Sequence, residues 1–292
     1  MTEREKFMKE LLYVEDSSDD KLKIDTFEKL NNSLFRLTQT LYDNKVNVSY
    51  HLKELEGKYI RFGFANQSII TLLRGNTFDI IDRKTTIIDV FSIHSIMRMQ
   101  IESFLWMFYL FYDNIEIAEK EFRYDIYKLH GLLKQSRFEI NNDEDKNEII
   151  KKRSEILDEI EQTKSRVIIT EKYLIASDKQ KKEYLDPPFP KLIKSELLFE
   201  NSRLRKSRIQ DLWSLYSNHA HAEHISDRQA NSIVNNGFVD INTISSVLSA
   251  CNILTARLIK NLIAQFPCAE DAYNNMSEKE KVPIDIWSGL SN

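Results

Sequence analysis

The sequence predicts an all-α fold: a multi-helix bundle around one long buried central helix at about residues 85–113, followed by an inserted charged helical arm. The chain of 292 residues contains only six glycines and five prolines, and no proline precedes Pro187. Because proline interrupts helices and glycine marks turns, this composition favours long helices over a turn-rich β architecture. Apolar residues that recur at intervals of three and four support the same conclusion.

Several helices are expected before the central one. The second of them carries an apolar seam at helical spacing. Gly57 and Gly63 weaken the third, and Gly75 with Asn76 supplies its C-terminal stop. The expected ranges are residues 1–23 (a short charged helix with an acidic turn), 25–42 and 48–74, and the seam consists of Phe27, Leu30, Leu34, Leu37 and Leu41.

The central stretch reads TTIIDVFSIHSIMRMQIESFLWMFYLFYD and is apolar almost all the way round. Thr86, three residues before Asp89, is a capping signal that predicts where the helix begins. Its uninterrupted apolar run, SFLWMFYLFY, is about half the length that a membrane span requires. We therefore expect a buried core helix and no membrane partner.

After the central helix we expect a more polar helix over about residues 115–137 and then the charged arm over residues 141–186. The arm has only a thin apolar stripe, which is typical of a long exposed helix. It could dock on the bundle or pair with a second copy to form a dimer. Pro187 begins a rigid extended connector that ends the arm. The stripe consists of Ile149, Ile156, Ile160 and Val167.

The helices that follow the connector are expected to complete the same bundle, so that the chain forms one domain overall. They include a helix over residues 209–222 and a long last helix from about residue 240, which Pro267 stops. The expected parts are an N-terminal half at residues 1–140, the arm at 141–186 and the C-terminal helices at 187–292.

Composition and charge indicate an ordinary globular chain. The net charge of −4 gives no general attraction to nucleic acid or acidic membranes, so binding of that kind would need a local basic patch. Cys251 and Cys268 are too few for a disulfide framework, and the N-terminus lacks the apolar core of a signal peptide. These features predict a cytoplasmic protein in a reduced compartment.

Two constellations could carry chemistry. His94, Arg98 and Glu102 stand four residues apart, which stacks them on one face of the central helix. A buried Arg–Glu pair at this spacing can simply satisfy itself and hold helix register. Ionisable groups in an apolar helix are nevertheless costly to bury and often mark functional sites. Both interpretations of this row stay open.

The second constellation is the group His219, His221 and His224. It could bind a metal or form a polar, partly exposed helix end, but it lacks the HExxH and Glu-x-x-His patterns. The sequence also contains no Gly-rich phosphate loop and no G-x-S-x-G elbow, so we expect no cofactor. We assign no metal ligand, and a metal-binding protein built on the histidine group stays a second alternative. The stretch SRLRKSR, residues 202–208, could meet phosphates or form the solvated first turn of the next helix.

The pattern Arg98-x-x-x-Glu102 on an apolar helix, followed by Tyr216-Ser217-Asn218-x-x-His221, resembles a poorly characterised group of bacterial all-helical proteins distantly similar to the HEPN helical bundles. The resemblance covers the central helix and residues 209–263. It implies metal-independent cleavage of RNA, often as the toxic component of an anti-phage or toxin–antitoxin system, by a homodimer.

The resemblance implies His221 as the proton carrier and Arg98 as the phosphate anchor. Glu102 would orient Arg98, with His219 and Asn218 assisting. The usual HEPN motif places its arginine a few residues before the histidine on the same helix, whereas here the arginine must come from another helix. A non-catalytic scaffold, sensor or antitoxin-like partner protein is therefore the alternative. The expected substrate contacts are Arg203, Arg205, Lys206, Arg208 and His94.

Overall fold

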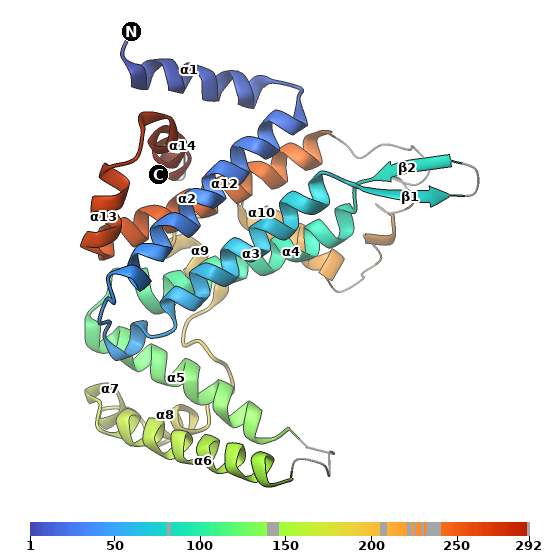
Figure 1. The fold of residues 1–292 in the computed structure, drawn as a ribbon. Coiled ribbons are helices and arrows are strands. Elements are labelled where there is room, and N and C mark those ends of the chain that lie inside the picture. Colours follow the sequence, from blue (N-terminus) through green and yellow to red (C-terminus); the bar gives the residue numbers. More distant parts are fainter. Residues whose placement is uncertain are drawn as a thin grey trace. The chain divides into compact units, whose positions relative to one another are not determined.

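Helices make up nearly all the regular structure that a computed structural model of the chain describes (Figure 1). The strands in the described part form one short antiparallel hairpin. The predicted all-α helical bundle is thus confirmed. The described residues are 1–80, 83–138, 146–204, 209–220, 224, 226–228, 231 and 241–290.

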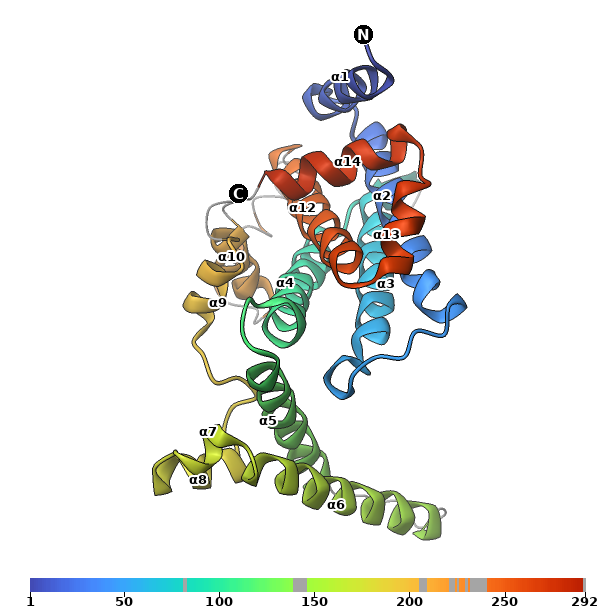
Figure 2. The same ribbon diagram turned by 90° about the vertical axis from the view of Figure 1, so that its left-hand side faces the viewer.

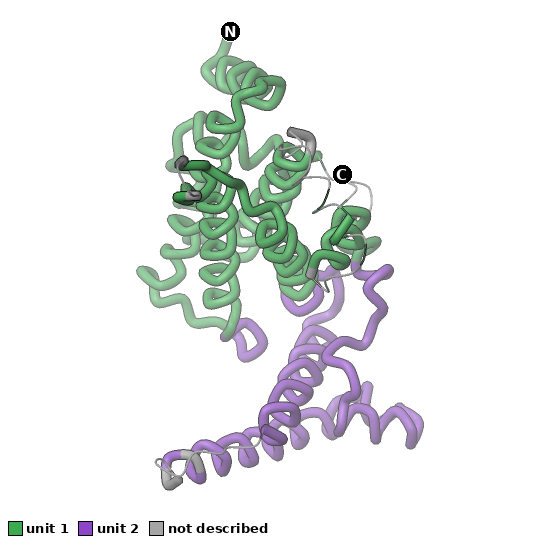
Figure 3. The backbone as a smooth tube through the Cα atoms, turned by 90° about the vertical axis from the view of Figure 1, so that its right-hand side faces the viewer, with its two compact units in different colours: residues 1–48, 54–108, 199–292 green, residues 49–53, 109–198 purple. Residues whose placement is uncertain are grey.

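The chain divides into two compact units, which Figure 3 distinguishes by colour. Residues 1–48, 54–108 and 199–292 form unit 1, and residues 49–53 and 109–198 form unit 2. In chain order the elements are α1 (Glu3–Asp16), α2 (Asp20–Asp43), the 3-10 turn η1 (Tyr50–Leu52), α3 (Leu55–Leu73), β1 (Asn76–Ile80), β2 (Arg83–Ile87), α4 (Val90–Met107), the π-helical turn η2 (Phe108–Tyr112), α5 (Ile117–Ser136), α6 (Lys146–Ile168), α7 (Glu171–Leu174), α8 (Asp178–Leu185), α9 (Ser195–Asn201), α10 (Ile209–Ala220), α12 (Ile241–Gln265), α13 (Pro267–Asn274) and α14 (Glu278–Gly289).

Helices α2 and α3 agree with the predicted pattern in their cores and differ at their starts. All five members of the α2 seam are buried, but the helix begins at Asp20, where the side chain of Asp19 caps the amide of Leu22. The predicted start of α3 near residue 48 is wrong, because a 3-10 turn and a break precede Leu55. The expected stop at Gly75 is present, with a φ of +78° that suits glycine.

The central helix is shorter than predicted. Its expected start at residue 85 is wrong, because residues 83–87 pair with residues 76–80 in the β-hairpin. Thr86 lies opposite Thr77 there, with their hydroxyls 3.2 Å apart, so it caps no helix. The N-cap of α4 is Asp89, whose carboxylate accepts from the amide of Ser92. The β-branched threonines here are compatible with a strand, and pairing with residues 76–80 decided the boundary.

A buried network of amide side chains links four helices of unit 1. Asn66 of α3 donates to Asn31 of α2 and to Thr255 of α12, at 3.0 Å in each case. The side-chain amide of Gln100 on α4 donates in turn to the side-chain oxygen Oδ1 of Asn66 at 2.6 Å. Asn31 donates to the backbone carbonyl of Gly63, where helices α2 and α3 come close. All four side chains are buried, so the network fixes how these helices face one another.

The close approach of α2 and α3 depends on Gly63. The ring of Phe35 lies only 2.5 Å from where a Cβ on this residue would stand. A glycine that the sequence shows as a weak point of the helix is thus a contact point between helices.

Helix α12 is the most apolar long helix of the C-terminal part. Its sequence predicts an apolar stripe of Ile241, Ile244, Leu248, Cys251, Leu258 and Leu262. The last five are buried, and the side chain of Ile241 lies outside the described part. Among the described helices, the stretch Thr243–Gln265 is long and apolar enough to cross a membrane, but 67% of it is buried within the protein, as in a core helix. It ends before Pro267, which begins α13.

In unit 2 the predicted charged arm docks along α5 instead of standing free. Ile156, Ile160 and Val167 of α6 meet an apolar face of α5 that includes Ile126 and Leu129. Arg166 of α6 also pairs with the buried Asp125 of α5 at 2.8 Å. The sequence left open whether the arm docks within its own chain or pairs with a second copy. Docking within the chain, on α5, accounts for the apolar stripe.

Replacing Asn66 by alanine should lower the free energy of unfolding of the protein by about 3 kcal/mol, because the buried polar groups of Asn31 and Thr255 would each lose a partner. Urea denaturation measures this loss. Ser68→Ala on the exposed side of the same helix is the matched control, since its hydroxyl only donates to Phe64 of its own helix. Equal losses in the two variants would contradict the structural role of the network.

Candidate functional site

Helices α4 and α10 lie side by side in unit 1 and bring His219, one member of the predicted histidine group, against the predicted row on α4 (Figure 2). The imidazole of His94 on α4 stacks on the ring of Tyr216 of α10, with centroids 4.5 Å apart. It also meets the imidazole of His219 edge to face, again with centroids 4.5 Å apart. One turn further along α4, the guanidinium carbon of Arg98 lies 4.2 Å from the Trp213 ring centroid. We call this group the α4–α10 cluster: His94, Arg98, Glu102, Trp213, Tyr216 and His219.

Arg98 is held on both sides. Its Nη1 atom lies 2.5 Å from Oε1 of Glu102, and the flat guanidinium rests on the indole of Trp213. The contact with Glu102 is an ion pair whose geometry is not that of a linear hydrogen bond, and Nε has no hydrogen-bond partner among the described residues. The Arg98 side chain is 14% exposed and that of Glu102 is 47% exposed. The pair is therefore buried at its cationic end and open to solvent at its carboxylate.

His94 is buried, with 6% of its surface exposed. Neither ring nitrogen has a hydrogen-bond partner in the described part of the chain. Burial lowers the pKa of His94 to about 4, and repulsion from His219 acts in the same direction. The imidazole is consequently neutral at pH 7 and able to accept a proton or to donate one hydrogen bond.

The other predicted site residues differ in where the structure places them. Asn218 and His219 are half-buried on the last turn of α10. Arg203 is exposed just after α9, with a left-handed φ of 58°. His221, the predicted proton carrier, lies outside the described residues, and so does its expected meeting with Arg98. The same holds for Arg205, Lys206 and Arg208.

One arginine that sequence reasoning missed lies in the same unit. Arg257 of α12 has its guanidinium carbon 5.4 Å from the Phe104 ring centroid, and its Nη1 is buried with no partner among the described residues. Burial lowers the pKa of Arg257 to about 10, and repulsion from Arg203 contributes. The signal was available in the sequence: a single arginine within the apolar run CNILTARLIKNLI.

The cysteines and the histidine group add no further site within the described residues. Cys251 is buried beside the sulfur of Met97, and burial raises the pKa of its thiol, which makes it a poor nucleophile. Among the residues that the structure describes, no group of three or more His, Cys, Asp or Glu side chains is arranged to hold a metal ion. His221 falls outside that search.

Comparisons with known proteins found no match to this chain among protein-family models, curated proteins or solved structures. The geometry of the α4–α10 cluster is therefore the main structural indication of function.

The stability of the protein should fall as the pH drops from 6.5 towards 4. Over this range the unfolded chain protonates His94, whereas the folded protein keeps it neutral, so unfolding takes up a proton. The free energy of unfolding should fall by about 3 kcal/mol over this pH range through His94 alone. Urea denaturation as a function of pH should show that His94→Phe is less sensitive to acid than the wild type. The exposed His224 provides the control, since His224→Gln should leave the profile unchanged; parallel profiles for wild type and His94→Phe would contradict the burial of a neutral imidazole.

Proposed function

We propose that this protein is a metal-independent endoribonuclease similar to the HEPN proteins, with its reaction centre on the face shared by α4 and α10. The observation that carries the proposal is the convergence of Arg98 with His94 and His219, which come from distant parts of the sequence. A cation that can stabilise charge on phosphorus and an imidazole that can transfer a proton are groups suited to cleavage of a phosphodiester, and Arg98 and His219 supply them here.

The chemistry follows from these groups. A histidine removes the proton from the 2′-hydroxyl of RNA, the 2′-oxygen attacks phosphorus, and the bond to the 5′-oxygen breaks. Returning a proton to that leaving oxygen gives a cyclic 2′,3′-phosphate and a free 5′-hydroxyl. The negative charge that grows on the phosphoryl oxygens is stabilised by Arg98, and no step requires a metal ion.

Each residue has a distinct role in this scheme. The proton carriers are His221 and His219, assisted by Asn218. Glu102 orients Arg98 until a phosphate takes the place of its exposed carboxylate on the guanidinium. His94 is too buried to contact the substrate directly. Its role in this scheme is to position His219 through the contact of their rings. The basic residues Arg203, Arg205, Lys206 and Arg208 would follow the RNA backbone.

We place this activity in anti-phage defence or a toxin–antitoxin system, with RNA as substrate and a homodimer as the working form. This setting rests on the resemblance of the Arg98 and His221 patterns to HEPN proteins.

A non-catalytic scaffold or sensor is the second candidate, and a specific observation favours it. His94 and Arg98 are nearly enclosed, which is typical of groups that lock two helices together. Their unpartnered nitrogens favour chemistry instead, because a purely structural network normally satisfies its buried donors.

Removal of Arg98 should abolish RNA cleavage without unfolding the protein. Purified wild type should degrade RNA in excess EDTA, and Arg98→Ala should reduce the rate at least about 100-fold. Arg98→Lys should also lose most activity, because lysine keeps the charge but cannot stack flat on Trp213. The readouts are product formation on gels and RNA integrity in bacteria that express each variant.

The matched control is Arg61→Ala, which removes an exposed arginine of α3 in the same unit. His219→Gln provides a second active-site variant if Arg98→Ala fails a thermal-melt test of folding. No cleavage by the wild type, or full activity in folded Arg98→Lys and His219→Gln, would contradict the nuclease proposal and favour the scaffold.

A further inference from the structure

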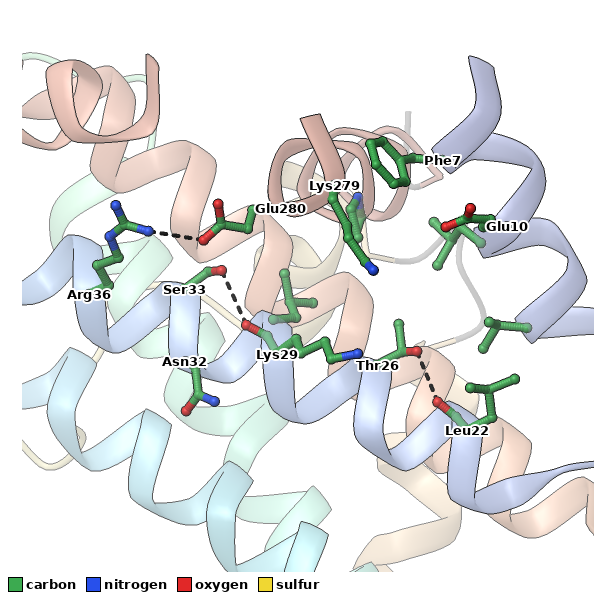
Figure 4. A pocket seen from close by; sticks show the side chains of 14 residues that line it. Phe7, Glu10, Leu22, Thr26, Lys29, Asn32, Ser33, Arg36, Lys279 and Glu280 are labelled. Carbon is green, nitrogen blue, oxygen red and sulfur yellow. Dashed lines mark hydrogen bonds and ion pairs between the residues drawn. The ribbon is translucent and has the colours of Figure 1, made fainter. Parts of the chain in front are cut away.

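A cavity of about 490 Å³ lies among α1, α2 and α14, formed wholly by unit 1 (Figure 4). Its apolar wall includes Leu11 and Leu30, both buried, together with Phe7, Val14 and Leu22. This volume lies within the usual range of small-molecule sites.

The polar side chains around the cavity are mostly engaged with the protein itself. The hydroxyls of Thr26 and Ser33 donate to backbone carbonyls of their own helix, as the dashed lines in Figure 4 show. Arg36 pairs with Glu280 at 2.9 Å. The remaining acid, Glu10, lies 4.0 Å from Lys6 on its own helix.

Two cations are left at the rim. Lys29 of α2 and Lys279 of α14 both line the cavity and are solvent-exposed, and neither has an acidic partner among the described residues. Lys279 also lies 5.9 Å from the ring centroid of Phe7, which places its ammonium beside the apolar wall. The cavity therefore combines an apolar interior with an excess of cations over acids among the side chains that line it.

We propose that this cavity binds a single linear aliphatic carboxylate, with the hydrocarbon chain against Leu11, Leu30 and Val14 and the carboxylate between Lys29 and Lys279. Charge complementarity selects an anion, and the apolar wall selects a chain over a small inorganic ion. The proposal is independent of RNA cleavage, since no residue of the α4–α10 cluster lines the cavity.

Isothermal titration of the full chain with decanoate tests this site, with decyltrimethylammonium as a ligand of equal chain length and opposite charge. Decanoate should bind and the cationic amphiphile should bind at least tenfold more weakly. The double variant Lys29→Gln/Lys279→Gln should weaken decanoate binding at least tenfold, whereas Lys29→Arg/Lys279→Arg should retain it. Val14→Trp, which fills the cavity, should also weaken it.

The matched control is Lys9→Gln/Lys21→Gln, which removes two exposed lysines of α1 and α2 that do not line the cavity. It should bind decanoate like the wild type. Absent binding, equal binding of both amphiphiles, or no effect of Lys29→Gln/Lys279→Gln would overturn the proposal. Sedimentation with anionic phosphatidylglycerol vesicles without binding of free decanoate would assign the face to a membrane surface and overturn it as well.

Discussion

The buried amide network of Asn31, Asn66, Gln100 and Thr255 is the constraint on which the arrangement of unit 1 depends. An apolar helix such as α4 can rotate about its axis with little change in buried area, because the hydrophobic effect has no direction. Hydrogen bonds between buried amides do have direction, and a buried donor or acceptor that is left without a partner lowers the stability of the fold. Gln100 therefore fixes the rotation of α4 against α3.

That rotation also decides where the ionisable row of α4 points. Gln100 follows Arg98 by two residues, which places it about 200° further round the helix. With Gln100 turned towards α3, the face that carries His94, Arg98 and Glu102 turns towards α10. The same helix is thus a structural element on one side and the centre of the candidate site on the other.

The amide network and the α4–α10 cluster, which both include side chains of α4, differ in how well their buried polar atoms are paired. In the amide network the side-chain donors have partners at normal hydrogen-bond distances, and one acceptor, Oε1 of Gln100, has none among the described residues. In the α4–α10 cluster, both nitrogens of His94 and the Nε of Arg98 have none among the described residues. Such groups lower the stability of a fold, so their presence calls for a functional explanation. A catalytic site would supply that explanation. The enclosure of Arg98 between Glu102 and Trp213 supports the alternative, in which the cluster only holds the two helices together.

Apolar periodicity in the sequence determined the all-α class, the seam of α2, the stripe of α12 and the shared face of His94, Arg98 and Glu102, because these depend on residues close along the chain. It did not determine where α4 begins, since Thr85 and Thr86 suit a strand as well as a helix start and pairing with β1 decided between them. Nor could it show that Arg98 meets Trp213, that His94 meets His219, or that Arg257 is buried. Those contacts join segments far apart in the sequence, and only the packing of one helix on another brings them together.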